Sequence, residues 1–119
     1  MNLDWTDFPD APELGAFLCE LTEIPKGVVL SKVVEGFPIL ALYVDQTPQV
    51  FVNACPHQFL PLDQRDGELL SNDGRHLMCT NHQAMFRVSD GQGTAGEGLG
   101  CRLSLIPSVI IDNNLYIKK

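Results

Sequence analysis

Long apolar segments are missing from this chain of 119 residues. No stretch approaches the roughly 18 consecutive apolar residues that a membrane-spanning helix requires. Residues 1–10 also lack the basic start and the apolar centre of a secretory signal peptide. These absences predict a cytoplasmic protein with no membrane partner, and the length predicts one domain over residues 1–119.

Positive charge is scarce as well. Eight Lys and Arg residues stand against fifteen Asp and Glu residues, which gives a formal net charge of −7. A surface that contacts nucleic-acid phosphates needs clustered basic residues, so this balance predicts that no nucleic acid is a partner. An acidic surface can steer a protein toward a basic patch on another protein, or it can simply favour solubility.

Cysteine and histidine are rare, at four and three residues, yet most of them fall into two short pairs. One residue separates Cys55 from His57, and two residues separate Cys79 from His82. Thiolates and imidazoles are the ligands that bind soft and borderline metals. The four side chains could hold one zinc ion tetrahedrally, or a [2Fe–2S] cluster with thiolates on one iron and imidazoles on the other.

The residues around the two pairs favour the cluster. Residues 55–62 read CPHQFLPL, and residues 78–91 read MCTNHQAMFRVSDG. This resembles the Rieske iron–sulfur family, whose two cluster loops are C-x-H and C-x-x-H, the second followed by an aromatic-containing strand and a turn. The resemblance covers nearly the whole chain. It implies an all-β Rieske-like fold of antiparallel sheets, with a small inserted cluster-binding subdomain at approximately residues 54–90.

The resemblance also implies a cofactor and a role. One Rieske-type [2Fe–2S] cluster would be bound by Cys55, His57, Cys79 and His82. The protein would then be a soluble Rieske-type ferredoxin that passes single electrons to or from a redox partner protein, an oxygenase or a reductase.

Two alternatives to a free electron carrier remain open. The chain could be the small Rieske component of a multi-subunit oxygenase or nitrite reductase. It is not expected to be a catalyst alone, because a 2-His-1-carboxylate iron site needs further ligands and only His76 lies outside the two motifs. The other alternative is a Cys2His2 zinc-binding module without redox activity.

Several positions depart from the family pattern. Gln83 stands where members usually carry Gly. Members of high potential carry a second cysteine in each loop and join the two by a disulfide. The corresponding positions here are Leu60 and Asn81, so that disulfide cannot form. Those members also place Ser and Tyr hydroxyls against the cluster sulfurs, where this chain has Ala84 and Phe86. Because hydrogen bonds to sulfur stabilise the reduced cluster, their loss predicts a potential of roughly −150 mV, the lower end of the Rieske range.

Short apolar runs broken by turn residues predict an all-β domain. Turns are expected at Glu35-Gly36, at residues 45–48 and at Asn113-Asn114, with a loop at 91–100 and at most one helical turn within 10–17. The expected strands are residues 16–22, 28–34, 38–44, 49–53, 68–71, 76–79, 84–88, 103–106, 109–112 and 115–118.

Three further features are interpreted as structural. The alternation of residues 16–22 places Phe17, Cys19 and Leu21 on one face of a strand, which predicts that Cys19 is a buried core thiol. Residues 91–96 fit the dinucleotide-binding pattern G-x-G-x-x-G, but Pro107 and a β-branched run follow instead of a helix, so we expect a turn. Cys101, after the glycine-rich loop, is expected to be structural or incidental, although its position could bring it near the cluster.

Overall fold

The computed structural model describes residues 4–54, 61–62, 69–79, 84–95 and 100–119, and the predictions for Cys55, His57 and His82 lie outside these residues. The described residues form short 3₁₀-helices at Trp5–Asp7 and Leu21–Glu23 and the strands β1 Phe17–Glu20, β2 Leu30–Val34, β3 Phe37–Val44, β4 Thr47–Val52, β5 His76–Met78, β6 Met85–Arg87, β7 Gly93–Ala95, β8 Leu105–Ile106, β9 Ser108–Ile111 and β10 Asn114–Ile117. This confirms the predicted all-β class. No helix among these residues has the length and apolarity needed to cross a membrane.

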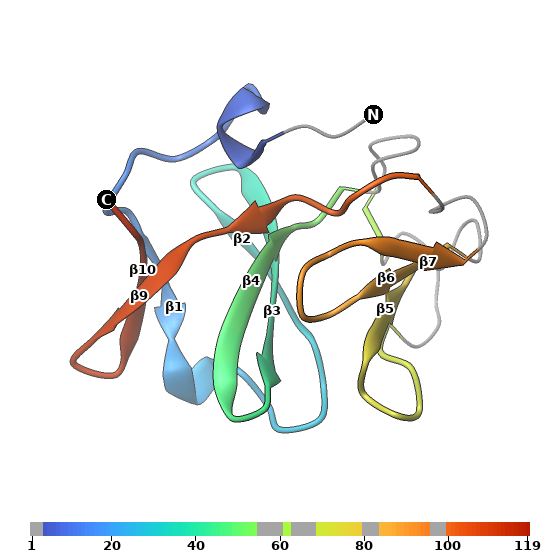
Figure 1. Ribbon diagram of the computed structural model, residues 1–119. Helices are drawn as coiled ribbons and strands as arrows, with labels where there is room; N and C mark the ends of the chain where they lie inside the picture. The colour runs from blue at the N-terminus through green and yellow to red at the C-terminus, as the bar shows by residue number, and fades with distance from the viewer. Residues whose placement is uncertain (1–3, 55–60, 63–68, 80–83, 96–99) are drawn as a thin grey trace.

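The strands form three antiparallel sheets. A central sheet has the order β2-β3-β4-β8, an outer sheet the order β1-β10-β9, and a hairpin sheet the order β5-β6-β7. In Figure 1 the central sheet stands in the middle of the view, with the outer sheet to its left and the hairpin sheet to its right.

The central sheet is buried on both faces. Side chains on a strand point alternately to opposite faces, and in β3 Ile39 and Ala41 join a first core that includes residues of the outer sheet. Leu40 and Leu42 join a second core, shared with the hairpin sheet. A strand that is covered on both sides needs apolar residues at successive positions, which explains the continuous apolar run of β3.

Two tight hairpins connect the first three strands of the central sheet. Glu35 and Gly36 have φ values of 51° and 84°, the left-handed pair that a two-residue turn between twisted strands favours, as predicted. The second turn is shorter than predicted, because Asp45 and Gln46 alone form it, with φ values of 50° and 67°. Pro48, expected in that turn, instead lies in β4 opposite Tyr43.

The predicted alternation around Cys19 is wrong, although its burial is confirmed. The pairing of β1 with β10 shifts between Phe17 and Cys19, so that Leu18 and Cys19 are both fully buried while Phe17 is 43% exposed. Leu21 is not in the strand but begins a 3₁₀-helix. Burial raises the pKa of the Cys19 thiol from 9.0 to about 11, with a smaller contribution from the carboxylate of Glu23.

Several smaller predictions also need correction. The segment 91–100, expected to be a loop, contains the edge strand β7. The strand expected at 68–71 is, in its described part, a single β-bridge between Leu70 and Leu77. The helical turn expected within 10–17 lies at Trp5–Asp7 instead. The last hairpin turns at Asp112 and Asn113, one residue earlier than predicted.

Candidate metal centre

Cys79, the first residue of the second cysteine–histidine pair, directly follows strand β5 of a hairpin. Strands β5 and β6 are in register, with Met78 opposite Met85 at their last position. One step further, the Cys79 N–H donates to the Ala84 carbonyl at 2.9 Å, so the hairpin is closed immediately before and after residues 80–83. Cys79 is therefore held at the base of the tip segment that contains His82 in the sequence.

Cys79 is surrounded by apolar side chains. The residue is 2% exposed and belongs to the second core. Leu62, Leu77, Ala84 and Phe86 of the same core are fully buried. A thiolate in such a dry environment suits a soft metal ligand, because the apolar shell restricts solvent access and thereby influences the redox potential of a bound centre.

The first pair follows the end of β4, and its two flanks are joined by one buried side chain. Asn53 is 4% exposed, and its Oδ1 accepts a hydrogen bond of 2.8 Å from the Leu62 N–H. The Asn53 N–H in turn donates to the Pro38 carbonyl at 3.0 Å on β3. The segment that carries Cys55 and His57 thus leaves and rejoins the described structure at one anchored point.

This hydrogen bond ties the end of β4 to Leu62, a residue of the second core. Leu62 follows the first motif and Cys79 begins the second, and both belong to the second core. From the sequence, Asn53 was expected only as the last residue of the strand 49–53. One sequence signal could have identified Asn53: it is a polar residue directly after the apolar run Val50–Val52 and two positions before Cys55. Buried polar side chains are usually hydrogen-bonded, and a buried amide can satisfy backbone groups.

A structured turn follows the second motif. The Asp90 carboxylate accepts two hydrogen bonds from the Arg87 guanidinium, at 3.0 and 2.6 Å, and one of 3.0 Å from the Gln92 N–H. The Arg87 hydrogen bonds and the Gln92 N–H hold the pKa of Asp90 below its usual range. At Gly91, φ is +80° and a Cβ atom would overlap the Leu103 carbonyl oxygen, so only glycine fits this turn.

His76 and Cys101 belong to neither motif. His76 is in β5, partly exposed, with its Nδ1 4.0 Å from the Asp73 carboxylate. Cys101 is partly buried, and its carbonyl accepts a hydrogen bond of 2.9 Å from the Gly93 N–H. Within the described part of the chain, no three His, Cys, Asp or Glu side chains gather as metal ligands, and three of the four predicted ligands fall outside that part.

The donor chemistry of the chain fits an iron–sulfur cluster of mixed ligation. Two thiolates and two imidazoles are available in the two motifs, and the described thiolate, Cys79, is buried in an apolar core rather than exposed to water. Among the described residues, no charged side chain is buried in this core.

Comparison with solved structures shows the same fold in electron-transfer proteins and in an oxygenase. The ferredoxin of carbazole 1,9a-dioxygenase from Nocardioides aromaticivorans IC177 is 18% identical, with a TM-score of 0.72 over 89% of this chain and 98% of that one. The Sphingomonas yanoikuyae B1 ferredoxin is 23% identical, with a TM-score of 0.72 over 88% and 98%. The terminal oxygenase of the Nocardioides enzyme is 12% identical, with a TM-score of 0.73 over 88% of this chain.

The lengths of these proteins differ. The chain spans 30% of the terminal oxygenase but 98% of each ferredoxin chain. The comparison with curated protein sequences gave no match. A family model, the Rieske [2Fe–2S] domain, matches residues 16–107, which include both cysteine–histidine motifs and most of the three sheets. The chain therefore belongs to the Rieske [2Fe–2S] family, whose domain carries one Rieske-type cluster.

Proposed function

We propose that this protein is an electron carrier that passes single electrons to or from a larger oxidoreductase. The observation that carries the proposal is the family match over residues 16–107 together with a buried Cys79 at the closed base of the second motif. A mixed Cys/His [2Fe–2S] cluster supplies one-electron redox chemistry when bound.

The proposed ligands are Cys55 and Cys79 for one iron and His57 and His82 for the other, within a cluster-binding subdomain at approximately residues 54–90. Cys79 is supported by its burial and by the hydrogen bond from its N–H to Ala84, which fixes the backbone at the ligand. Neutral imidazoles in place of two thiolates reduce the negative charge around the iron, which places the potential above that of an all-cysteine ferredoxin.

The protein matrix around the proposed ligands has two tasks. The fully buried side chains of Leu62, Leu77 and Phe86 exclude water from the side of the second core. The bonds of Asn53 and of Cys79 fix the segments that enter and leave the two motifs. With Ala84 and Phe86 in place of hydroxyl-bearing residues, the reduction potential is expected near −150 mV, roughly the lower end of the Rieske range.

The proposed partner is an oxygenase. Two of the similar structures are ferredoxins, and another is a complex of reduced oxygenase and oxidized ferredoxin in carbazole 1,9a-dioxygenase. The chain matches nearly the whole of the ferredoxin chains, which favours a separate carrier over the Rieske part of a longer subunit. The acidic balance of −7 suits a partner with a basic docking surface. A cytoplasmic location belongs to the same proposal, and cell fractionation tests it.

Electron paramagnetic resonance on anaerobically purified, dithionite-reduced protein tests the proposal, with iron, sulfide and zinc measured on the same sample. A rhombic signal whose average g value is below that of an all-cysteine cluster supports it. Stoichiometric zinc without a signal would instead support the Cys2His2 zinc module. Protein-film voltammetry then measures the potential, and a value above about +100 mV would contradict the low-potential assignment.

A further inference from the structure

The N-terminal segment of this chain lies outside the matched domain but is part of the packed structure. The Rieske domain matches residues 16–107, so residues 4–15 are additional to it. Trp5 is 5% exposed and belongs to the first core, and Phe8 packs against the same core. The Phe8 ring contacts the Phe37 ring edge-on, with 6.0 Å between the ring centroids. The segment is therefore fixed in place at the start of β3.

A hollow of about 390 Å³ lies between this segment and the central sheet. Its lining is mostly apolar and comes from Phe8, from Phe37 and Val52 of the central sheet, and from Ala54 and Pro61. Ala54 immediately precedes the first cysteine–histidine pair in the sequence, and Pro61 follows it. Figure 1 shows the first 3₁₀-helix at the top of the view, above the central sheet. The N-terminal addition and the flanks of the first motif thus form one concave surface.

The rim of this hollow is acidic. Asp7 and Asp10 line it, and both are exposed. The Asp7 carboxylate accepts a hydrogen bond of 3.0 Å from the Asp4 N–H, and among the described residues no basic side chain forms an ion pair with Asp7 or Asp10. Residues 4–13 contain four Asp and Glu residues and no Lys or Arg, so these ten residues carry −4 of the net charge of −7. More than half of the net negative charge therefore lies beside this hollow.

We propose that this hollow is the docking site of the redox partner, an inference that rests on the electron-carrier function proposed above. It receives a segment of the partner in which a lysine or arginine is flanked by apolar side chains. The hydrocarbon stem of a lysine or arginine packs on apolar surface while its charged end stays in water. That end pairs with the carboxylates of Asp7 and Asp10, and the apolar neighbours cover the lining. A partner seated here lies next to Cys55, one of the proposed ligands, because Ala54 forms part of the hollow.

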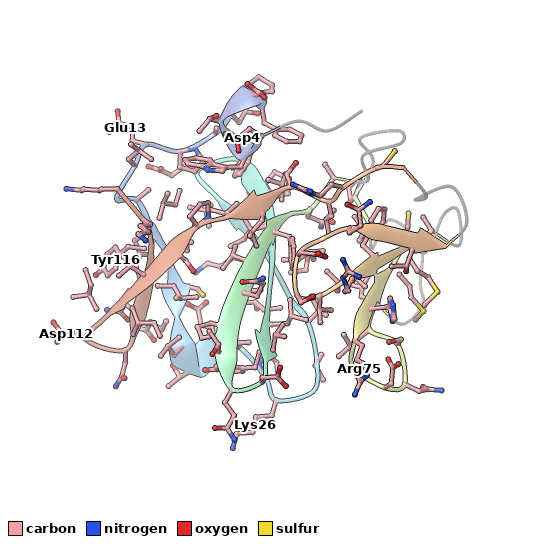
Figure 2. All side chains as sticks on the ribbon, in the orientation of Figure 1. Asp4, Glu13, Lys26, Arg75, Asp112 and Tyr116 are labelled. Atoms are coloured by element: carbon pink, nitrogen blue, oxygen red, sulfur yellow. The ribbon has the colours of Figure 1, made fainter. Side chains whose placement is uncertain are left out.

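Charge distinguishes this occupant from a second copy of the chain. A second copy carries the same net charge of −7, so repulsion opposes its approach to this face. A basic protein is attracted instead, and charge that is concentrated at one end of the molecule also orients the protein as it approaches. Figure 2 shows Asp4 at the opposite end of the molecule from Lys26. The acidic end therefore selects a basic partner and directs it to the hollow.

Electron transfer to cytochrome c, a basic haem protein, tests the proposal on the full chain carrying its cluster. One electron passes from the reduced cluster to the ferric haem, and stopped-flow absorbance gives the second-order rate constant. Asp7→Asn/Asp10→Asn removes two charges, and the amide oxygen at position 7 can still accept from the Asp4 N–H. The rate constant of this variant is expected to be at least about threefold below that of the wild type at an ionic strength of about 0.1 M.

Two matched controls separate the hollow from the total charge. Asp45→Asn/Asp112→Asn also removes two charges, from exposed residues in hairpin turns outside the hollow. The molecule measures 38 × 30 × 23 Å, and screening at about 0.1 M acts over roughly 10 Å, so these distant charges should change the rate constant by less than about 1.5-fold. Pro9→Lys adds a positive charge to the lining and should also slow the transfer. Pro25→Lys adds the same charge at an exposed proline next to Lys26 and should not.

The results distinguish the docking site from the electron-carrier function. Circular dichroism and the paramagnetic signal establish that every variant is folded and holds its cluster. If the wild type reduces cytochrome c but the two double variants behave alike, the docking site is wrong and the function stands. If the reduced wild type transfers no electron, the function is wrong and the docking site fails with it.

A second measurement locates the contact without electron transfer. Amide chemical shifts of the oxidised protein are followed while ferrous cytochrome c is added. Changes at residues 7–10 and at Ala54 are expected, because these residues line the hollow. Changes confined to other residues would overturn the proposed site.

Discussion

The hydrogen bond from the Leu62 N–H to Asn53 gives the sharpest test of how the first motif is held. Asn53→Leu keeps a side chain of similar size but removes the acceptor, so that the Leu62 N–H is left buried without this bond. Stranding a buried backbone donor costs about 1–3 kcal/mol. A domain of this size is stabilised by roughly 5–15 kcal/mol in total, so the loss is large enough to measure and small enough to leave the protein folded.

The expected result has two parts. Chemical denaturation should show a free energy of unfolding lower by about 2 kcal/mol. The segment between Asn53 and Leu62 also loses its closing contact, so metal should be lost faster from the variant when a chelator is added. Visible absorbance and bound iron, followed over time at a temperature where both proteins remain folded, measure this second effect.

Two controls separate the anchor from general damage. Asn53→Asp keeps an oxygen that can accept from the Leu62 N–H, so it should retain metal longer than Asn53→Leu. Gln49→Leu removes another side-chain amide of β4, whose bond of 3.0 Å to the Ser89 carbonyl is exposed, and should change little. If Asn53→Leu matches the wild type in both stability and metal retention, Asn53 does not position the first motif.

Three further predictions follow from the described residues. Gly91→Ala should destabilise the fold by at least about 3 kcal/mol, because the added Cβ overlaps the Leu103 carbonyl oxygen at a position of positive φ. Gly36→Ala also has positive φ but open space around the added Cβ, so it should cost about 1 kcal/mol in the same denaturation assay. The pKa of the Cys19 thiol is near 9 in the unfolded chain and about 11 in the folded protein. The unfolding free energy of the wild type, measured relative to Cys19→Ala, should therefore decrease as the pH rises from about 9 to about 11, by at most about 3 kcal/mol. A difference that stays constant over this pH range would contradict the prediction. Ala84→Ser should raise the potential by about 40 mV if its hydroxyl donates about 1 kcal/mol more to the reduced cluster, and voltammetry showing no rise would refute that placement.

Much of the central sheet could be predicted from local pattern. The apolar run of β3 and the Glu35-Gly36 turn agree with each other, because a two-residue turn fixes the register that buries both faces of the strand. Pro48 was misjudged because proline is usually read as a turn residue. Proline is tolerated here because hydrogen-bonded and non-hydrogen-bonded pairs alternate along the ladder. The Val44–Thr47 pair that closes the hairpin is hydrogen-bonded, so the next pair, Tyr43–Pro48, needs no N–H from position 48.

Other features depended on tertiary contacts that no local pattern encodes. The irregular pairing at Phe17 and Cys19 reverses which side chains point inward, and it appears only once β1 meets β10. Strand β7 forms in a glycine-rich segment because β6 offers it an edge. The four proposed ligands were identified from their residue types, their spacing and the resemblance to the Rieske family, whereas the role of Asn53 was not predicted and became evident from its hydrogen bond to Leu62.

The two-sided burial of the central sheet gives the protein two separately packed halves. Ile39 and Leu40 are adjacent and equally buried, yet Ile39 faces the core shared with the outer sheet and Leu40 the core shared with Cys79. Packing in the first core fixes β1 and β10, whereas packing in the second fixes Leu62 and Cys79. A close-packed interior transmits strain, so the backbone of β3, which both cores share, is the path by which a change in one core would reach the other. The buried strand β3 thus couples the packing of the outer sheet to the packing around Cys79.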